Sequence, residues 1–348
     1  MNVLSLFDGM SCGQQALKEL GIRVDNYYAS EIDKYAIQIA KKNFPNTIHV
    51  GDVTQLKGTD LPQIDLLMGG SPCQGFSFAG KQLNFNDPRS ALFFEFVRVM
   101  KETKPKYFLL ENVRMKQEYQ DVITAHMGVK PIMINSSLLS AQNRVRLYWT
   151  NIPNIEQPKE QGVVLQDILE DEFVADREKS YCIDANYYKG ANWEQYKNKS
   201  RRQLVTKPQQ VAEATDINGH DMIKRVYSPL GKSPALTTMQ GGNTQPKVSI
   251  RDTENYYQLN REGAYPNQQQ DRIRKPNKPS NTLTSGASSI PKVMLKGLHY
   301  RKLTPLECER LQTLPDNYTE GVSNTQRYKM IGNGWTIEVI KHILNEMQ

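Results

Sequence analysis

The segment LSLFDGMSCG, residues 4–13, decides the fold. It joins a short apolar run, typical of a buried strand, to the start of a helical pattern. Gly9 and Gly13 at this turn allow a ligand to approach the backbone at the carboxyl end of the strand, where doubly wound sheets bind cofactors. The segment lacks the dinucleotide fingerprint G-x-G-x-x-G, which argues against a nicotinamide oxidoreductase.

Strand and helix patterns continue to alternate as far as residue 150. Apolar runs predict strands at residues 3–7, 27–30, 64–68, 107–110, 132–134 and 147–150. Helical spacing occurs at residues 14–20, 34–43, 91–102 and 116–126. This alternation predicts an α/β domain built on a doubly wound, mostly parallel sheet.

The character of the chain changes after this region. A long polar stretch follows, and helical spacing returns only at residues 303–311 and 336–344. We therefore expect one α/β domain formed by residues 1–170 and 301–348, with a smaller domain, residues 171–300, inserted into it.

Basic residues concentrate in the expected insertion. The net charge is +7, and residues 174–300 hold 20 Lys and Arg against 11 Asp and Glu. A surface that faces nucleic acid requires such a surplus, because neutralisation of phosphates dominates affinity, but a solvated basic face has the same composition. A weak repeat also occurs there: RVYSPLGKSPALTTMQGGNTQPKV starts at Arg225, and RIRKPNKPSNTLTSGASSIPKV starts at Arg272. Two such loops suit two stretches of DNA, and equally suit two structural hairpins.

Several classes of protein are disfavoured by composition. No apolar run approaches the roughly 18 residues of a membrane helix, and the first residues lack the features of a signal peptide. The four cysteines and five histidines are scattered, without a C-x-x-C pair. We therefore expect no disulfide and no metal site, in a protein that stays in the cytoplasm.

Two acidic residues lie further along the chain, in the segments SEID and HVGDV. Glu31 lies where an acidic side chain can accept both ribose hydroxyls of a nucleoside, and Asp52 lies where it can bond the amine of an adenine. The pattern fits S-adenosylmethionine better than NAD, although many α/β domains have a glycine turn and an acidic residue without this function.

The segment GGSPCQGFSFAGKQ, residues 69–82, directly follows another predicted strand. A free cysteine is usually a buried apolar residue. Cys73, however, is flanked by Pro72 and Gln74, which are loop residues rather than core partners. We interpret Cys73 as an exposed nucleophile and residues 77–90 as a mobile closing loop.

Charged residues also interrupt two later strands. Glu111 ends the apolar run of LLENV, where a buried carboxylate needs a ligand or a proton. Arg144 and Arg146 alternate in AQNRVRLYW and so point to one face of a strand. They need an anionic or carbonyl partner there, or they form a surface salt bridge.

Together these segments resemble a known family. Pro72-Cys73-Gln74, Glu111-Asn112-Val113 and Gln142-x-Arg144-x-Arg146 look like the catalytic motifs of the DNA (cytosine-5)-methyltransferases, in order. LFDG and SEID are similar to the family's cofactor motifs, and residues 301–318 and Gly332-Asn333-Gly334 to its closing motifs. The resemblance covers residues 1–152 and 301–344, and it is to the bacterial and phage type.

The resemblance implies a Rossmann-like methyltransferase that uses S-adenosylmethionine and carries an inserted target-recognition domain. Cys73 would attack carbon 6 of a cytosine flipped out of duplex DNA, which activates carbon 5. Glu111 would hold ring nitrogen 3 and the exocyclic amine, Arg144 would bind the ring carbonyl, and Arg146 would support the site.

The resemblance also implies a cofactor pocket with two departures from the family pattern. The pocket residues would be Phe7, Asp8, Gly9, Glu31, Ile32, Asp52, Val53, Pro72, Leu92, Asn333 and Trp335. Ile32 stands where the family often has a large aromatic that packs on the adenine, and Trp335 stands where a small residue is commoner. We expect weaker packing of the cofactor at Ile32, without loss of function.

Double-stranded DNA is the implied substrate. Contacts with it are expected from Gln74, Ser77, Gln82, Arg225 and Arg272, since arginine to guanine is the commonest specific contact. We expect a monomer that acts in a bacterial nucleoid or a phage-infected host, with or without a cognate restriction endonuclease.

Two alternatives stay open. A transfer RNA cytosine-5 methyltransferase of the same fold shares the cysteine motif, but its Cys-Phe-Thr signature is absent from the insertion. A DNA-binding protein with a decayed methyltransferase core would have lost Cys73, Glu111 or Arg144, and all three are present.

Overall fold

The computed structural model forms two compact units. It describes residues 1–71, 88–171, 173–189, 196, 198–200, 202–206 and 300–347, and the backbone of five strands between residues 210 and 274. The first unit consists of Met1–Ile168, Glu178–Gln203 and Leu303–Gln348, and the second of Leu169–Arg177 and Leu204–Lys302. The boundaries expected near residues 170 and 301 lie close to two of these limits. Glu178–Gln203, however, groups with the α/β unit and not with the insertion.

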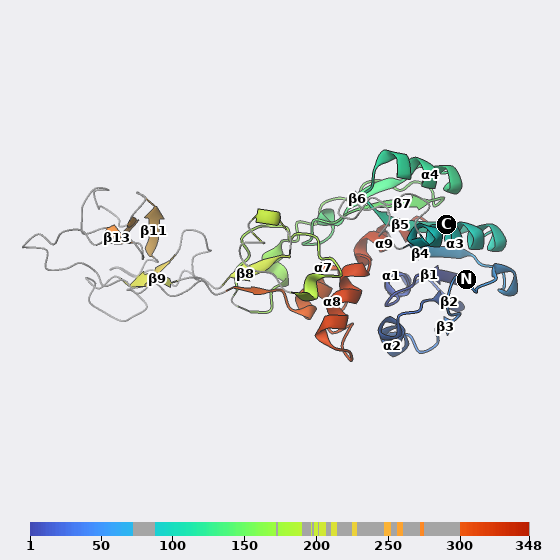
Figure 1. Ribbon diagram of the computed structural model, residues 1–348, viewed down its shortest axis with the longest axis horizontal. Helices are drawn as coiled ribbons and strands as arrows, with labels where there is room; N and C mark the ends of the chain where they lie inside the picture. The colour runs from blue at the N-terminus through green and yellow to red at the C-terminus, as the bar shows by residue number, and fades with distance from the viewer. Residues whose placement is uncertain are drawn as a thin grey trace, which may run out of the picture. The chain divides into compact units, whose positions relative to one another are not determined.

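A seven-stranded sheet forms the centre of the first unit, in the order β3-β2-β1-β4-β5-β7-β6 (Figure 1). Its strands are β1 (Asn2–Leu6), β2 (Asn26–Ser30), β3 (Ile48–His49), β4 (Leu66–Gly70), β5 (Tyr107–Val113), β6 (Ile132–Asn135) and β7 (Val145–Thr150). β7 is antiparallel to β5 and β6, whereas β1 to β5 pair in parallel. The prediction of a doubly wound, mostly parallel sheet is therefore confirmed.

Helices cover the sheet on both sides. The helices of the described residues are α1 (Cys12–Glu19), α2 (Lys34–Asn43), α3 (Pro88–Thr103), α4 (Gln117–Met127), α7 (Pro305–Leu311), α8 (Asn324–Asn333) and α9 (Ile337–Leu344). α1 packs against α9 on one side of the strands, and α3 and α4 lie on the other side (Figure 1). Side-chain caps define where two of these helices begin. The side chain of Asp33 accepts hydrogen bonds from the first backbone amides of α2, and Thr304 and Glu307 form a capping box at the start of α7.

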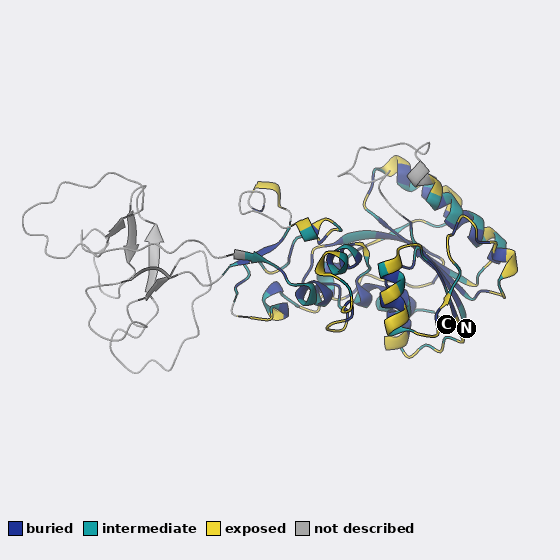
Figure 2. Cartoon of the chain, turned by 60° about the horizontal axis from the view of Figure 1, so that its bottom comes forward, coloured by how far each residue is buried: buried dark blue, intermediate teal, exposed yellow. Residues whose placement is uncertain are grey.

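The core lies between the central strands and α3 and α4. Seven of its buried members, each 1% exposed or less, are Leu4, Leu6, Leu67, Phe93, Phe96, Leu110 and Ile123. Buried positions are dark blue in Figure 2. The order of the strands reverses between β1 and β4, because the chain runs outward from β1 to β3 before it returns. Ligands of doubly wound sheets bind at the carboxyl ends of the strands beside such a reversal. The packed core therefore holds that edge of the sheet rigid.

The second unit contains two sheets. β8 (Leu204–Thr206) pairs with β14 (Tyr300–Lys302). A five-stranded sheet has the order β13-β12-β11-β10-β9, with bounds of Arg272–Arg274, Tyr256–Leu259, Lys247–Arg251, Arg225–Tyr227 and Gln210–Glu213. Both copies of the repeat thus begin with a strand, β10 and β13.

None of the helices in the described ranges has the length and apolarity that crossing a membrane requires. Those ranges also contain no cluster of three or more His, Cys, Asp or Glu residues suited to a metal ion.

Candidate active site

The turn after β1 has an unusual backbone. Phe7, Gly9 and Ser11 all adopt positive φ, at 56°, 60° and 64°. Such a conformation costs roughly 1 kcal/mol or more at a residue with a side chain, so hydrogen bonds must hold it. The amide of Gly9 donates to Glu31 Oε2 (2.7 Å), and the amide of Asp8 donates to the carbonyl of Ser30 (3.1 Å). A Cβ added at Gly9 would meet no atom within 4 Å, so the turn borders open space.

Two carboxylates lie at the same edge of the sheet. Glu31 accepts from the amides of Gly9, Ile32 and Asp33 (2.7, 2.7 and 2.8 Å), which fix its orientation and still leave acceptor capacity. Asp52 is exposed after β3 and accepts from the amide of Thr54 (2.9 Å). Ile32 is 74% exposed beside Glu31. This set of groups fits a nucleoside: acceptors for hydroxyls and an amine, and an apolar side chain for the base.

Asp8 differs from the expectation that it touches the cofactor. Its side chain turns inward, where it accepts from Ser11 Oγ (2.5 Å) and the hydroxyl of Tyr27 (2.7 Å). Burial, with a smaller contribution from Glu31, raises the pKa of Asp8 from 3.8 to about 6. The carboxyl group of Asp8 therefore supports the turn from the interior of the protein. The side chain of Val53, which was also expected in the cofactor pocket, is buried in the core.

We expect Asp8→Asn to change the pH dependence of stability. Because the folded-state pKa lies above the unfolded one, the folded protein binds more protons between about pH 4 and 6, and the free energy of unfolding falls as pH rises through that window. The isosteric amide removes this loss, so the variant should be more stable than the wild type by about 1 to 3 kcal/mol at pH 8 and nearly equal to it only at about pH 3.5, below the unfolded-state pKa. Urea unfolding at both pH values measures the difference. A variant that is less stable at pH 8 would show that the ionised carboxylate supports the turn.

Glu111 lies near the carboxyl end of β5, opposite Gly70 of β4. It is 8% exposed, and the predicted need for a partner is met twice. Its Oε1 forms an ion pair with Arg146 Nε (2.9 Å), and its Oε2 accepts from the indole Nε1 of Trp335 (3.1 Å). Next to it, Asn112 Nδ2 donates to Ser71 Oγ (3.2 Å). This bond ties β5 to the chain two residues before Cys73.

Arg144 occupies a different position from the one expected of a residue that binds the base. Its guanidinium is 3% exposed and donates to the carbonyls of Ile183 (3.0 Å), Gly334 (2.9 Å) and Gly332 (3.3 Å). These bonds join the start of β7 to two segments that are remote in sequence. Arg144 therefore holds the backbone of the site together, whereas Arg146 contacts the carboxylate of Glu111.

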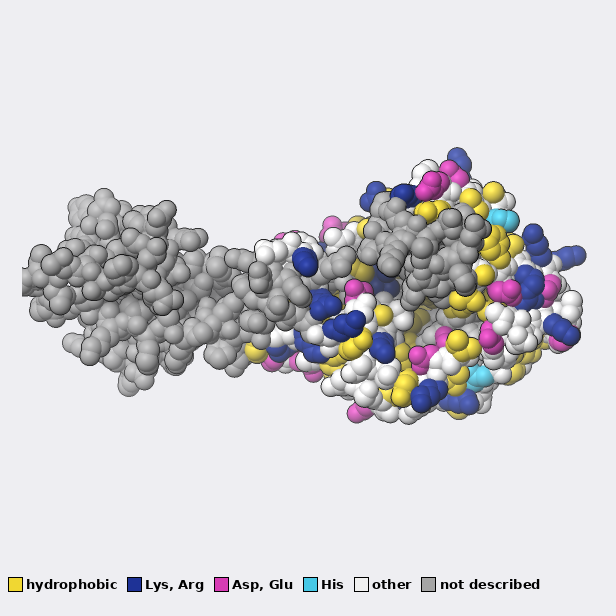
Figure 3. Space-filling model, in the orientation of Figure 1, with side chains coloured by type: hydrophobic (Ala, Val, Ile, Leu, Met, Phe, Trp, Pro, Cys, Tyr) yellow, Lys and Arg dark blue, Asp and Glu magenta, His cyan; other side chains and the backbone are white. Residues whose placement is uncertain are grey.

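The other predicted site residues divide into three groups. Leu92 is half-buried against the core, and Asn333 is exposed at the end of α8. Pro72, Cys73, Gln74, Ser77 and Gln82 lie outside the described residues. Arg225 and Arg272 are described only as positions in β10 and β13. On the face of the first unit seen in Figure 3, Lys and Arg occur together with Asp and Glu, which agrees with the small net charge of residues 1–150.

Sequence reasoning missed several residues that support the site. Tyr27 holds Asp8, and Tyr318 donates to the carbonyl of Met10 in the cofactor turn (2.8 Å). Gln312 Nε2 donates to the carbonyls of Ile331 (2.8 Å) and Gly334 (3.3 Å). The one available signal was the presence of polar residues in otherwise apolar segments.

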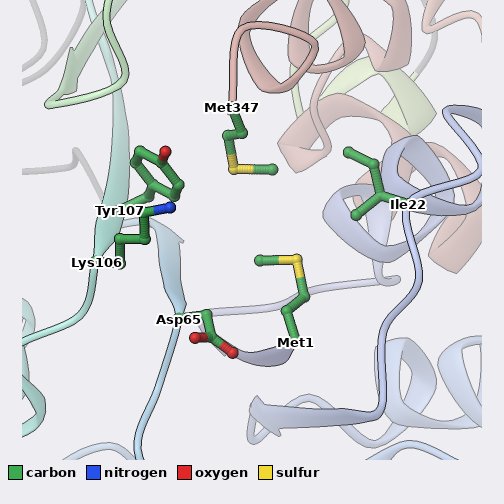
Figure 4. A pocket seen from close by; sticks show the side chains of 6 residues that line it. All are labelled: Met1, Ile22, Asp65, Lys106, Tyr107 and Met347. Carbon is green, nitrogen blue, oxygen red and sulfur yellow. The ribbon is translucent and has the colours of Figure 1, made fainter.

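A cavity of about 350 Å³ lies at the opposite edge of the sheet (Figure 4). It is lined by Met1, Ile22, Asp65, Lys106, Tyr107 and Met347. Met1, Asp65 and Tyr107 lie at the amino ends of β1, β4 and β5. None of the predicted site residues lines it, so it is separate from the candidate active site.

Comparisons with known proteins agree with this geometry. Residues 1–348 match the family model described as C-5 cytosine-specific DNA methylase. The chain is 31% identical to the orphan methyltransferase M.SPBetaI of Bacillus phage SPbeta, over 100% of this chain and 97% of that protein. It is 26% identical to the type II methyltransferase M.HhaI of Haemophilus parahaemolyticus, over 99% and 93% of the two chains.

Solved structures share the fold. A methyltransferase from Entamoeba histolytica superposes with a TM-score of 0.59 at 15% identity, over 99% of this chain and 97% of that one. A putative DNA modification methyltransferase encoded within an Escherichia coli prophage gives a TM-score of 0.55 at 22% identity, over 99% and 98%.

Proposed function

The chain belongs to the C-5 cytosine-specific DNA methylase family, and from that premise we propose that it methylates cytosine at a specific site in double-stranded DNA through a covalent bond to Cys73. The observation that carries the proposal is the carboxylate of Glu111, which is held by an ion pair with Arg146 and a hydrogen bond from Trp335. It lies at the same edge of the sheet as Glu31 and beside the strand that leads to Cys73. Base recognition and cofactor binding thus meet at one edge.

The chemistry follows from the weakness of carbon 5 of cytosine as a nucleophile. Addition of the Cys73 thiolate to carbon 6 converts the ring to an enamine, which is nucleophilic at carbon 5. Glu111 contacts nitrogen 3 and the exocyclic amine as charge develops on the ring. Once carbon 5 carries the methyl group that S-adenosylmethionine would supply, with S-adenosylhomocysteine as the leaving group, a base such as a water molecule removes the carbon 5 proton, and the thiolate of Cys73 leaves.

The positions of the two arginines suggest a revised division of roles. The donors of Arg144 are directed at backbone carbonyls, whereas Arg146 lies against Glu111 with its side chain 14% exposed. We therefore assign contact with the ring carbonyl to Arg146, and the support of the site to Arg144. This reverses the expectation from sequence.

The cofactor is S-adenosylmethionine, which supplies an electrophilic methyl group when bound. Glu31 is placed to accept its ribose hydroxyls, and Asp52 its adenine amine. Gly9 and Asn333 would border the methionine end, and Phe7 and Ile32 would lie against the adenine. The open space beside Gly9 and the exposure of Ile32 support this arrangement.

We expect Ile32→Trp to bind the cofactor more tightly. An indole stacked on adenine adds about 0.5 to 1.5 kcal/mol beyond the area it buries, so the Kd of S-adenosylmethionine should fall roughly 3- to 10-fold. Isothermal titration calorimetry measures it. Met133→Trp is the matched control, because Met133 is also an exposed apolar residue (52%) but lies on β6, away from Glu31. An unchanged or weaker affinity for Ile32→Trp would remove Ile32 from the adenine site.

Target recognition is assigned to the basic second unit, with Arg225 and Arg272 as candidate base contacts. The enzyme would act as a monomer on bacterial or phage DNA. The test uses tritiated S-adenosylmethionine with unmethylated bacterial genomic DNA and, separately, bulk transfer RNA. The expected result is label in DNA alone, with bisulfite sequencing showing 5-methylcytosine at one recurring sequence. Label in transfer RNA, or in DNA at a base other than cytosine, would overturn the proposal.

A further inference from the structure

The indole of Trp335 lies between the cofactor turn and the carboxylate of Glu111. Its Nε1 donates to Glu111 Oε2 (3.1 Å). A Cβ added at Gly13, beside the cofactor turn, would lie 3.4 Å from Trp335 Cζ3, and one added at Gly70 would lie 3.0 Å from Trp335 Nε1. The ring thus lies beside Gly13 of α1 and occupies space that Gly70 leaves next to Glu111 of β5.

We propose that Trp335 is a positioning residue, whose indole N–H holds one oxygen of Glu111 so that the carboxylate is correctly oriented for the cytosine ring. This inference rests on the proposed function of Glu111. The sequence resemblance suggested that Trp335 contacts the cofactor, whereas this inference concerns its hydrogen bond to Glu111. The inference also explains why a large residue stands at position 335.

The need for such a donor follows from the neighbouring arginine. Arg146 Nε already pairs with Glu111 Oε1 at 2.9 Å. Arginine and carboxylate groups favour a bidentate geometry, in which both oxygens face the guanidinium. A carboxylate bound by Arg146 alone would turn toward that geometry and lose its alignment with the base. The neutral N–H of Trp335 restrains the second oxygen without adding another charge.

Gly70 supports the same interpretation. It is opposite Glu111 in the sheet, and a Cβ there would lie 2.9 Å from Glu111 Oε2 as well as 3.0 Å from Trp335 Nε1. Both distances are shorter than an ordinary van der Waals contact, so a methyl group would push the two partners apart. The glycine is therefore required by the space that the Trp335 and Glu111 pair occupies.

The experiment compares Trp335→Phe with Trp149→Phe. Trp149 is a matched control because its Nε1 donates to Thr124 Oγ1 (3.0 Å) and its side chain is 0% exposed, in contact with the core and not with Glu111. Single-turnover methylation of unmethylated bacterial DNA gives the rate. Calorimetry with S-adenosylhomocysteine gives cofactor affinity. Covalent trapping on an amplified duplex that contains 5-fluorodeoxycytidine gives the rate of adduct formation.

Loss of a hydrogen bond to a charged group predicts that Trp335→Phe lowers the methylation and trapping rates about 10- to 100-fold. The Kd of S-adenosylhomocysteine should change less than about 3-fold, and Trp149→Phe should change neither quantity by more than that. In a Glu111→Gln background, Trp335→Phe should add less than about 2-fold, because residues that act through one another are not additive. Gly70→Ala should reproduce the loss of rate if Trp335→Phe does not fold.

Each contrary result has a distinct meaning. A rise in the Kd of S-adenosylhomocysteine that matches the fall in rate would make Trp335 a cofactor contact and overturn the inference. Equal losses in Trp335→Phe and Trp149→Phe, or full additivity with Glu111→Gln, would also overturn it. Failure of the wild-type protein to form an adduct would contradict the proposed function instead.

Discussion

Replacing Cys73 by serine is expected to lower methyl transfer by roughly 10⁴-fold or more, the scale seen when an enzyme loses its nucleophile. A serine hydroxyl is a far weaker nucleophile than a thiolate near neutral pH unless a base activates it. The variant should still bind DNA and S-adenosylmethionine, since the groups assigned to binding are unchanged. It should not form the covalent adduct on DNA that contains 5-fluorodeoxycytidine.

The measurement is incorporation of tritiated methyl groups, with adduct formation followed by denaturing electrophoresis. Cys182→Ser is the control, because Cys182 is an exposed cysteine of the α/β unit, whereas Cys12 and Cys308 are buried. The control should retain the adduct and most of the activity. A Cys73→Ser protein that methylates at an undiminished rate would refute the covalent mechanism.

Arg144→Ala is expected to have the largest effect on stability, a loss of about 3 to 5 kcal/mol in the free energy of unfolding. The substitution leaves the buried carbonyls of Ile183, Gly332 and Gly334 without the guanidinium that now donates to them. Each buried acceptor without a donor costs about 1 to 3 kcal/mol, although water that enters the space recovers part of this.

Arg146→Ala provides the comparison in the same experiment. Arg146 is more exposed and pairs with Glu111, so its loss should cost less stability and more activity. Urea unfolding and single-turnover methylation at one temperature separate the two effects. The reverse pattern, with Arg144→Ala stable and inactive and Arg146→Ala unstable, would restore the division of roles that the sequence motif suggested.

Six of the seven strands of the central sheet were predictable because their apolar runs are short and lie between glycine and proline residues. β3 (Ile48–His49) was not predicted, since it has only two residues. The need of Glu111 for a partner was predictable from the cost of burying a carboxylate alone. The identity of the partners was not. Arg144 and Arg146 alternate along one strand, so the sequence pattern does not distinguish them. Arg144 donates to backbone carbonyls only because Ile183 and Gly334, which are remote in sequence, pack beside it.

The structure differs from the sequence-based predictions at two further places, and each difference has a local physical cause. The resemblance implied that Asp8 contacts the cofactor, whereas its side chain is turned inward at a turn where Phe7 and Ser11 adopt positive φ. No sequence pattern predicts that backbone conformation. Glu178–Gln203 joins the α/β unit despite its polar composition. The hydroxyl of the buried Tyr187 donates to the carbonyl of Gln203 and accepts from the amide of Leu303, which anchors this segment.

The packing of α1 against α9 has a consequence for biosynthesis. These helices are separated by most of the chain, so the apolar face of α1 remains uncovered on the ribosome until residues 337–344 have been translated. The carbonyls of Gly332 and Gly334, which accept hydrogen bonds from Arg144, also leave the ribosome late. Nascent chains thus carry the thiol of Cys73 long before the surroundings of Glu111 are complete, and the site can form only after translation has passed Trp335.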